Sequence, residues 1–271
     1  MGKCLSACSG EESQTNLSSS KSNSSVPSQR DVYRPTQKNS FQKTQAEKTS
    51  GINSIDIRRS LNMRPEYDEA KIDAMFHKYK DDGEDSILEE GMEKFCQDLG
   101  FDPTEFVVLV LAWKFNASKM CRFTKKEFTD GCRLLKVDSV NGIRQTLNEL
   151  EREVGNNREE FRELYRFTFG FGLDIDEGQR VLPTTMAMPL WKLLFGENSP
   201  TFMDKWYSFL ETKSVRAIPR DTWNMFLHMV ETIKEDFSNY DESEAWPSLF
   251  DDFVETQRKS VTGNGSVEIN E

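Results

Sequence analysis

The chain has 271 residues and a formal net charge of -11, and this charge is unevenly distributed. Residues 1–60 carry nine Lys or Arg against five Asp or Glu, whereas the rest of the chain carries 26 basic and 41 acidic side chains. The acidic body excludes a nucleic-acid-binding protein, because phosphate binding depends on Lys and Arg, and it favours a basic protein partner.

The chain begins with Met-Gly-Lys-Cys-Leu-Ser-Ala-Cys, which fits the N-myristoylation pattern of Gly2 followed by Ser6. One myristoyl chain binds a membrane only marginally, so stable anchoring needs a second signal. Cys4 and Cys8 are the candidates for palmitoylation. We predict a lipid anchor at these residues; the alternative is a chance match, since Met-Gly starts are common. The segment has no apolar core typical of a secretory signal.

Residues 1–66 are predicted to be a disordered, lipidated tail. The first 60 residues are rich in Ser, Asn, Gln, Thr and Lys, and contain only Tyr33 and Phe41 as aromatics. Such a segment buries too little apolar surface to offset the entropy of ordering. A flexible chain of about 60 residues spans on the order of 40 Å, so the tail suits a tether. Its basic charge suits an anionic membrane surface.

Residues 67–258 show helical periodicity and predict an all-α body, either one compact domain or two packed halves; we expect one domain. Two short helices come first, over residues 71–79 and 88–99, and each has one apolar face. These faces consist of Ile72, Met75, Phe76 and Tyr79 in the first helix and of Met92, Phe95, Cys96 and Leu99 in the second. Residues 259–271 are predicted to be a disordered C-terminal tail.

The third helix is predicted to start at Asp102, as its N-cap, with Pro103 in the first helical position. Its stretch 106–115 is apolar nearly all round, so it should be central in the core. The apolar run within it, residues 106–113, is far shorter than the about 20 residues that a membrane span needs. Pro189 should shift the start of its helix or kink it. The later helices are predicted over residues 124–135, 139–151, 158–171, 184–195, 201–210, 219–233 and 244–256.

One loop has the frame of an EF-hand without its ligands. With Glu127 at position 12 and Phe123 at position 8, Met120 and Cys121 take positions 5 and 6. A calcium loop needs an oxygen ligand and a glycine there. We therefore predict no metal at this loop.

The preceding loop is degenerate in the same way. With Ile87 at position 8, Gly91 takes position 12, where the strongest ligand is required. A hard divalent cation needs six to eight oxygens, and neither loop supplies them. The helix pairs are expected to keep the EF-hand frame without an ion.

Several strings are more specific than helical periodicity. They are Leu-Ala-Trp-Lys-Phe at 111–115, Glu-Phe-Thr-Asp-Gly at 127–131, Leu-Tyr-Arg-Phe-Thr-Phe at 164–169, Ile-Pro-Arg-Asp-Thr-Trp-Asn at 218–224 and the acidic run over 238–255. Over about residues 67–257 they resemble, in order and spacing, the defective-in-cullin-neddylation family and its potentiating-neddylation domain. The tail is similar to that of the family's membrane-associated member. The resemblance implies an all-α fold of EF-hand-like helix pairs.

The resemblance implies a scaffold that holds the C-terminal winged-helix domain of a cullin. It places the cullin-binding residues at Asp221, Ala245 and Asp251, with Asp252 and Glu255 beside them. Carboxylates on one helical face would steer and bind a basic surface. Periodicity alone leaves another interpretation open, in which Asp221 only stabilises a helix N-terminus and the acidic run is a solvated face.

The resemblance also implies an apolar pocket for the acetylated N-terminal methionine of the neddylation conjugating enzyme. The residues carried over by position are Val108, Ala112, Cys121, Phe123, Phe171, Leu190 and Leu193. Burying a Met side chain stabilises by roughly 1.5–3 kcal/mol, and acetylation removes an amine charge that is costly to desolvate. From periodicity alone these residues are simply core.

The predicted function is therefore a membrane-tethered, non-enzymatic scaffold for cullin neddylation that needs no cofactor. Its expected location is the cytoplasmic face of the plasma membrane, with further pools in the cytoplasm and near or in the nucleus. Two alternatives remain, a myristoylated calcium sensor and a ligase with a catalytic Cys121. The second lacks support, because only Arg122 stands beside that thiol and no Cys/His cluster is spaced for zinc.

Overall fold

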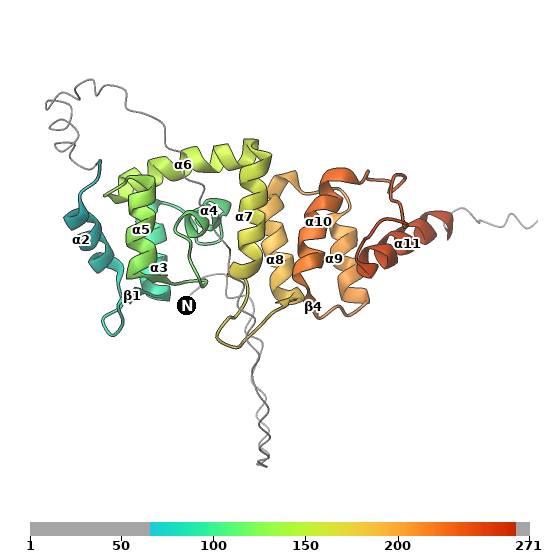
Figure 1. Ribbon diagram of the computed structural model, residues 1–271, viewed down its shortest axis with the longest axis horizontal. Helices are drawn as coiled ribbons and strands as arrows, with labels where there is room; N and C mark the ends of the chain where they lie inside the picture. The colour runs from blue at the N-terminus through green and yellow to red at the C-terminus, as the bar shows by residue number, and fades with distance from the viewer. Residues whose placement is uncertain (1–65, 264–271) are drawn as a thin grey trace, which may run out of the picture. The chain divides into compact units, whose positions relative to one another are not determined.

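The structure is a computed structural model that describes residues 66–263 (Figure 1). The predicted tail up to residue 65, with Gly2, Cys4 and Cys8, lies outside the described residues. So does residue 264 onward. The predictions made for these two segments therefore stay predictions.

Helices joined by short loops and two-residue strands make up the described residues, which confirms the all-α class. None of these helices has both the length and the apolar character needed to cross a bilayer. The elements are α2 (Glu69–Tyr79), β1 (Ser86–Ile87), α3 (Glu89–Leu99), α4 (Phe106–Lys114), β2 (Phe123–Thr124), α5 (Lys125–Leu135), α6 (Val140–Asn156), α7 (Arg158–Phe171), β3 (Leu182–Pro183), α8 (Thr184–Phe195), η1 (Gly196–Asn198), α9 (Met203–Thr212), β4 (Ala217–Ile218), α10 (Arg220–Thr232) and α11 (Ser248–Gly263).

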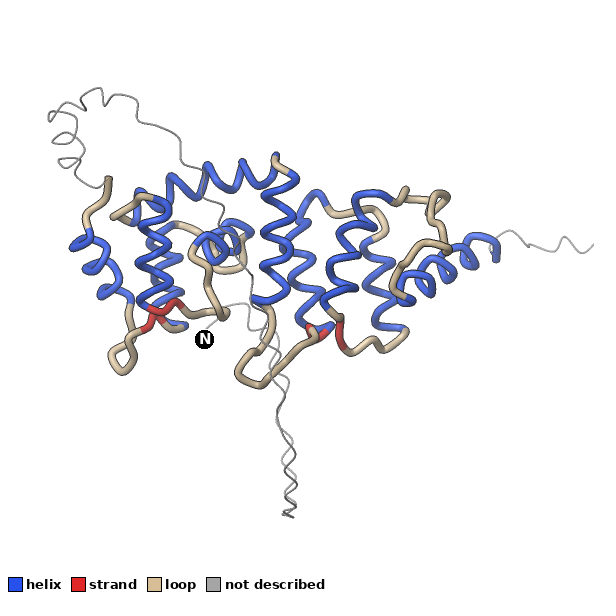
Figure 2. The backbone as a smooth tube through the Cα atoms, in the orientation of Figure 1, coloured by secondary structure: helices blue, strands red, loops and turns tan. Residues whose placement is uncertain are grey.

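The first four-helix unit, α2 to α5, has the arrangement of two paired EF-hands. Its loops meet through the antiparallel strands β1 and β2, which pair Ile87 with Phe123 (Figure 2). These are the two residues expected at position 8, so the predicted frame is confirmed. At position 12 of the earlier loop, a Cβ on Gly91 would overlap with the backbone carbonyl of Tyr79. The glycine is therefore required by close packing.

The second four-helix unit, α7 to α10, repeats this arrangement. Strands β3 and β4 pair Leu182 with Ile218. Two-residue strands are too short to leave an alternating pattern in the sequence, so none was predicted. Helix α6 packs against α3, α4 and α7 and so connects the two units, and α7 packs against both α8 and α10 (Figure 1).

The core follows the predicted apolar faces. All eight residues expected to face inward on the first two helices are buried in α2 and α3. Helix α4 is buried on nearly every side, which confirms its central position. In the second unit, the Trp191 and Trp223 rings stack at 5.0 Å. Trp191 Nε1 donates to Tyr165 Oη at 2.9 Å, and Tyr165 Oη donates to the Trp223 carbonyl at 2.8 Å.

Two predicted helix starts are wrong, and local chemistry explains each. Asp102 does not cap α4; its carboxylate accepts from the Thr104 backbone at 2.8 Å and closes a separate turn before the helix. Helix α11 begins at Ser248 instead of residue 244. The reason is Pro247, because a proline disfavours helical backbone in the residue before it.

Other boundaries shift without changing the topology. Helix α6 continues past the expected residue 151, because Val154 extends its buried face. Helix α8 starts at Thr184 as expected and runs through Pro189, so the proline does not shift the start. Helix α11 continues to Gly263, past the domain boundary expected at residue 258.

Candidate binding surfaces

The five predicted cullin-binding residues lie on α10, on α11 and on the loop between them. Asp221 is exposed in the first turn of α10, and Ala245 is exposed on the loop. On α11, Asp252 and Glu255 are exposed and Asp251 is half-buried. We call these five residues the acidic surface.

Trp246, directly after the alanine, brings the three parts of the acidic surface together. Its ring stacks on His228 of α10 at 5.4 Å and on Tyr240 at 5.3 Å. His228 lies two turns from Asp221 on the same side of α10. The Tyr240 hydroxyl donates to Asp251 Oδ1 at 2.7 Å. The indole therefore joins α10, the loop and, through Tyr240, Asp251 of α11, and Asp221 lies two turns away along α10.

Arg258 holds the loop that carries this indole. Its guanidinium donates to Glu242 at 2.6 Å and to the backbone carbonyls of Phe237 and Tyr240 at 3.3 and 3.2 Å. Sequence reasoning missed both Tyr240 and Arg258. A tyrosine inside an otherwise polar acidic run is the one sequence signal that could have indicated a buried contact.

The carboxylates of the acidic surface differ in environment. Burial and, after it, the hydrogen bond to Asp251 raise the pKa of Tyr240, so its hydroxyl stays protonated and donates at neutral pH. Glu255 pairs with Lys259 at 2.6 Å, and this contact lowers the pKa of the Glu255 carboxyl. At neutral pH the Tyr240 hydroxyl is therefore uncharged and can donate to Asp251, and the Glu255 carboxylate is ionised.

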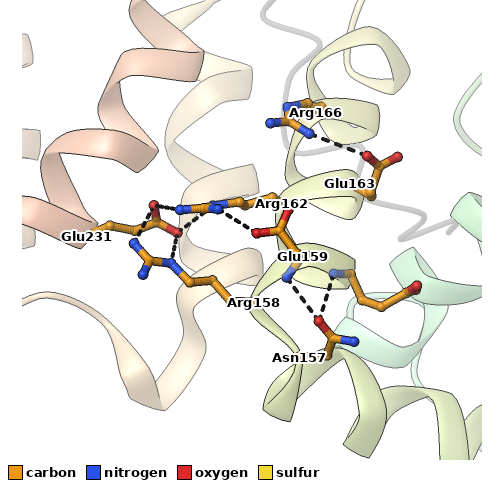
Figure 3. A network of polar contacts seen from close by, with 8 residues as sticks. Asn157, Arg158, Glu159, Arg162, Glu163, Arg166 and Glu231 are labelled. Atoms are coloured by element: carbon orange, nitrogen blue, oxygen red, sulfur yellow. Dashed lines mark hydrogen bonds and ion pairs between the residues drawn. The ribbon is translucent and has the colours of Figure 1, made fainter.

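An ion pair between Glu231 and two arginines fixes α10 against α7 (Figure 3). Arg158 and Arg162 of α7 donate to Glu231 of α10 at 2.9 and 2.7 Å. Hydrogen bonds from these arginines lower the pKa of Glu231 to about 2, against the opposing effect of burial. The Glu231 side chain is only 13% exposed. The nearby pair of Arg166 and Glu163, at 3.4 Å, is exposed.

The second predicted site is a hollow in the first unit, which we call the apolar pocket. Five of the seven predicted residues line it: Val108, Ala112, Cys121, Phe123 and Phe171. Sequence reasoning missed its other lining residues, which are Met92, Cys96, Pro103, Leu109, Ala117, Lys119, Met120 and Arg122. Most of these are apolar residues from α3, α4 and the loop after α4, so the hollow suits an uncharged apolar group.

Leu190 and Leu193 are not brought to this pocket. Leu190 is fully buried, and its Cδ1 would lie 2.7 Å from a Cβ on Gly172. Leu193 lines a different hollow with Phe161 and Val230. The two leucines lie on α8, whose buried side faces the second unit, whereas the pocket is built mainly by the first.

The wall of the apolar pocket is fixed by Glu127, the residue at position 12 of the loop. Its Oε1 accepts from the Ser118 backbone at 2.8 Å, and its Oε2 accepts from the backbone and hydroxyl of Thr124 at 2.8 and 2.9 Å. Burial would raise the pKa of Glu127, but these hydrogen bonds outweigh it and lower the pKa. Cys121 has a φ of 55°, the left-handed conformation that glycine supplies in a calcium loop.

The chain's own N–H and O–H groups thus take the place that a cation has in an EF-hand. Among residues 66–263, no three His, Cys, Asp or Glu side chains are grouped as metal ligands.

The thiols of Cys132 and Cys121 differ in burial. Cys132 is buried, and burial raises its pKa to about 12, whereas Cys121 is half-buried in the wall of the apolar pocket.

Residues 142–256 match the protein family described as "Cullin binding". The chain is 52% identical to DCN1-like protein 3 of Homo sapiens over 199 residues, which cover 72% of this chain and 65% of the relative. It is 51% identical to DCN1-like protein 3 of Rattus norvegicus over 203 residues, or 73% and 66% of the two chains. The protein of that name in Drosophila melanogaster is 48% identical over 186 residues, or 68% and 54%.

The chain belongs to the DCN1-like family. It spans just under two thirds of the length of the mammalian relatives. The family match over residues 142–256 includes all five residues of the acidic surface and the whole second four-helix unit. The family resemblance inferred from the sequence strings is confirmed.

Proposed function

We propose that this DCN1-like chain is a non-catalytic scaffold for cullin neddylation that works at membranes. It binds the C-terminal winged-helix domain of a cullin through the acidic surface. It binds the acetylated N-terminus of the neddylation conjugating enzyme in the apolar pocket. Lipidation at Gly2, with Cys4 or Cys8, holds it at the cytoplasmic face of the plasma membrane, with further pools in the cytoplasm and near or in the nucleus.

The observation that carries this proposal is the set of contacts of Trp246, next to Ala245. Its ring packs on His228, on the same side of α10 as Asp221, and on Tyr240, whose hydroxyl donates to Asp251. Exposed carboxylates beside a small residue accept hydrogen bonds from Lys or Arg and let the partner backbone approach. The family match over the same residues supports a cullin as that partner. The loop is held before binding by Arg258 and Tyr240, so little ordering entropy is lost on association.

The apolar pocket supports the second half of the proposal. Its lining offers carbon and sulfur surface to a Met side chain, and acetylation leaves no charged amine to desolvate. A scaffold that holds both proteins together converts a bimolecular transfer into an effectively unimolecular one. Rate enhancement then needs no catalytic group of its own.

A calcium sensor is disfavoured by one observation. Both Glu127 oxygens are occupied by hydrogen bonds from Ser118 and Thr124. An ion would have to displace these contacts with no carboxylate at positions 3 and 5 to compensate. The scaffold remains the function that the geometry supports best.

Calorimetric titration of the full chain with a cullin C-terminal domain tests the proposal. We expect binding in the wild type and its loss in the Asp221→Ala/Asp251→Ala double variant. The matched control is Asp73→Ala/Asp130→Ala, which removes two exposed carboxylates of the first unit. Loss of binding in the control, or retention in the test variant, would contradict the assignment of the acidic surface.

The membrane half of the proposal needs a separate measurement. In fractionated cells, Gly2→Ala should move the chain from the membrane pellet to the supernatant, because myristoylation requires that glycine. A Cys4→Ser/Cys8→Ser variant should be partly released, since one acyl chain binds weakly. Unchanged partition of Gly2→Ala would refute lipid anchoring and leave the two binding surfaces unaffected.

A further inference from the structure

The two paired loops of the second unit carry positive charge on an otherwise acidic body. Residues 178–184, around β3, and residues 212–220, around β4, contain four Lys or Arg and no Asp or Glu. The corresponding loops of the first unit, residues 80–88 and 116–124, contain three basic and four acidic side chains. The frame that the two units share therefore does not explain these cations.

The pairing of β3 with β4 brings the four cations to one end of the unit. The strands are antiparallel, and the Thr184 N–H donates to the Arg216 carbonyl at 3.0 Å. The chain before β3 therefore lies beside the chain after β4, which places Arg180 and Arg220 at the same end of the ladder. Lys213 follows α9 directly. Figure 1 shows β4 and the loop after α7 at the same end of the helices. We call Arg180, Lys213, Arg216 and Arg220 the basic edge.

The charges of the basic edge are open to a partner. All four side chains are exposed. The Arg220 guanidinium lies over the Phe169 ring at 4.5 Å, and the Lys213 ammonium lies over the Phe209 ring at 5.9 Å. No ion pair between residues of the described range 66–263 includes a member of the basic edge. A group that brings negative charge to this edge therefore displaces no internal carboxylate.

Apolar surface lies between these cations. Val181, next to Arg180, is 44% exposed, and Pro219, next to Arg220, is exposed as well. An exposed apolar side chain flanked by cations suits the surface of an anionic bilayer. There the apolar group enters the headgroup region and the cations meet lipid phosphates.

Carboxylates border the basic edge and restrict it to this end of the unit. Asp221 follows Arg220, and Asp174 and Glu177 are exposed earlier on the loop after α7. An anionic surface attracts the edge and repels these carboxylates. The body therefore has one favoured orientation on such a surface, in which the edge is in contact and the acidic surface is turned away.

We propose that the basic edge docks the folded body on anionic phospholipids, with Val181 in the headgroup region. This inference rests on the membrane half of the proposed function, because the anchor at Gly2 brings the body to the bilayer. Roughly 60 residues separate that anchor from the described residues, which is enough length for the body to reach the surface. The anchor alone sets no orientation. The basic edge supplies one that leaves the acidic surface accessible to its partner.

Co-sedimentation of the myristoylated full chain with lipid vesicles tests the inference. Pure phosphatidylcholine vesicles measure the anchor alone, and vesicles with about 30% phosphatidylserine add the negative charge. We expect Arg180→Ala/Arg216→Ala to bind the anionic vesicles about tenfold more weakly than wild type, because each cation adds affinity there. The control, Lys94→Ala/Lys234→Ala, removes the same charge from two exposed lysines elsewhere and should bind as wild type. All three should bind neutral vesicles equally.

A second pair of variants tests the apolar contact. Val181→Asp should weaken binding to the anionic vesicles about fivefold, since it places a negative charge within the edge. Ile175→Asp is the matched control, because Ile175 is 57% exposed on the same loop but lies among carboxylates outside the edge; it should bind as wild type. Added salt should remove the difference between the arginine variant and wild type.

Hydrogen exchange of wild type on the two kinds of vesicle locates the contact. The amides of residues 178–184 and 212–220 should exchange more slowly on anionic than on neutral vesicles. Wild-type affinity of the arginine variant for anionic vesicles, or protection confined to another face, would overturn the inference and leave the anchor standing. Loss of cullin binding in that variant, with unchanged vesicle affinity, would assign the edge to a protein partner instead. The anchor fails separately, if Gly2→Ala sediments with neutral vesicles as wild type does.

Discussion

The two four-helix units share one frame but fill it differently. The first packs phenylalanines, with Phe115 and Phe128 in edge contact at 5.8 Å, and leaves the apolar pocket beside Phe123. The second is filled by indoles, with Trp191 stacked on Trp223 at 5.0 Å and against Trp206 at 6.0 Å.

This difference suits the two kinds of binding proposed above, one through charges and one through an apolar pocket. Flat indoles fill the second unit, two of them, Trp191 and Trp223, donate hydrogen bonds, and the unit is a rigid support for charges on its surface. The first unit is filled by the smaller phenylalanine rings, and Cys121 in the loop after α4 has left-handed backbone. Together they leave room in the apolar pocket for a side chain from another protein. The same pairing of loops thus supports an electrostatic surface in one unit and an apolar pocket in the other.

The largest effect is expected for Trp191→Ala. Removing a fully buried indole that stacks on Trp223 and meets Trp206 edge-on should lower the free energy of unfolding by about 3–5 kcal/mol, measured by urea denaturation. The matched control, Trp113→Ala, removes the half-buried indole of α4 and should cost less than half as much. An equal loss in the free energy of unfolding in both variants would contradict the view that indole packing distinguishes the second unit from the first.

Gly131→Ala tests how tightly the first unit is packed away from its pocket. A Cβ there would overlap with the Phe115 ring, so we expect a loss of up to about 3 kcal/mol in the free energy of unfolding. Gly155→Ala on α6 is the control, because nothing lies within 4 Å of its added methyl; it should stabilise by up to about 1 kcal/mol. A neutral Gly131→Ala would mean that the Phe115 ring can move.

Glu231→Gln should cost about 2 kcal/mol at pH 7, because the charged carboxylate holds two arginines. Its pKa is lowered from 4.5 to about 2. Its stabilisation is therefore complete above about pH 5 and is lost as the pH falls towards 2. Urea denaturation at pH 7 and at pH 2–3 should show the difference from wild type shrinking in acid. Glu163→Gln, which breaks the exposed pair of Glu163 with Arg166 within α7, should show no such dependence.

The smallest effect is expected for Tyr240→Phe. Losing the hydrogen bond to Asp251 should weaken cullin binding by about fivefold, equivalent to about 1 kcal/mol, measured by calorimetry. Tyr207→Phe is the control, because that hydroxyl is buried without a hydrogen-bond partner, and it should leave the affinity unchanged. Unaltered binding in Tyr240→Phe would show that Asp251 does not need to be held.

The spacing of apolar residues predicted the helices, because a helix repeats its apolar face every three to four residues. The EF-hand positions in the two loops predicted how these helices pair. The faces of α2 and α3 and the pairing of Ile87 with Phe123 follow from such local rules. The position of Leu190 does not, because it depends on how α8 packs against Gly172 at the end of α7, which is a contact between two helices. Tyr240 and Arg258 were missed for the same reason, since their contacts are made between a loop and a helix.

The hydrogen bonds of Glu127 have a consequence for how the protein is controlled. In an EF-hand sensor, the carboxylate at position 12 closes on an arriving ion and the helix pair opens. Here that carboxylate accepts hydrogen bonds from Ser118 and Thr124 of its own loop, so the protein's own groups hold the place of the ion between α4 and α5. In the proposed scaffold, control would then depend on the location of the protein and on the occupancy of the acidic surface and the apolar pocket.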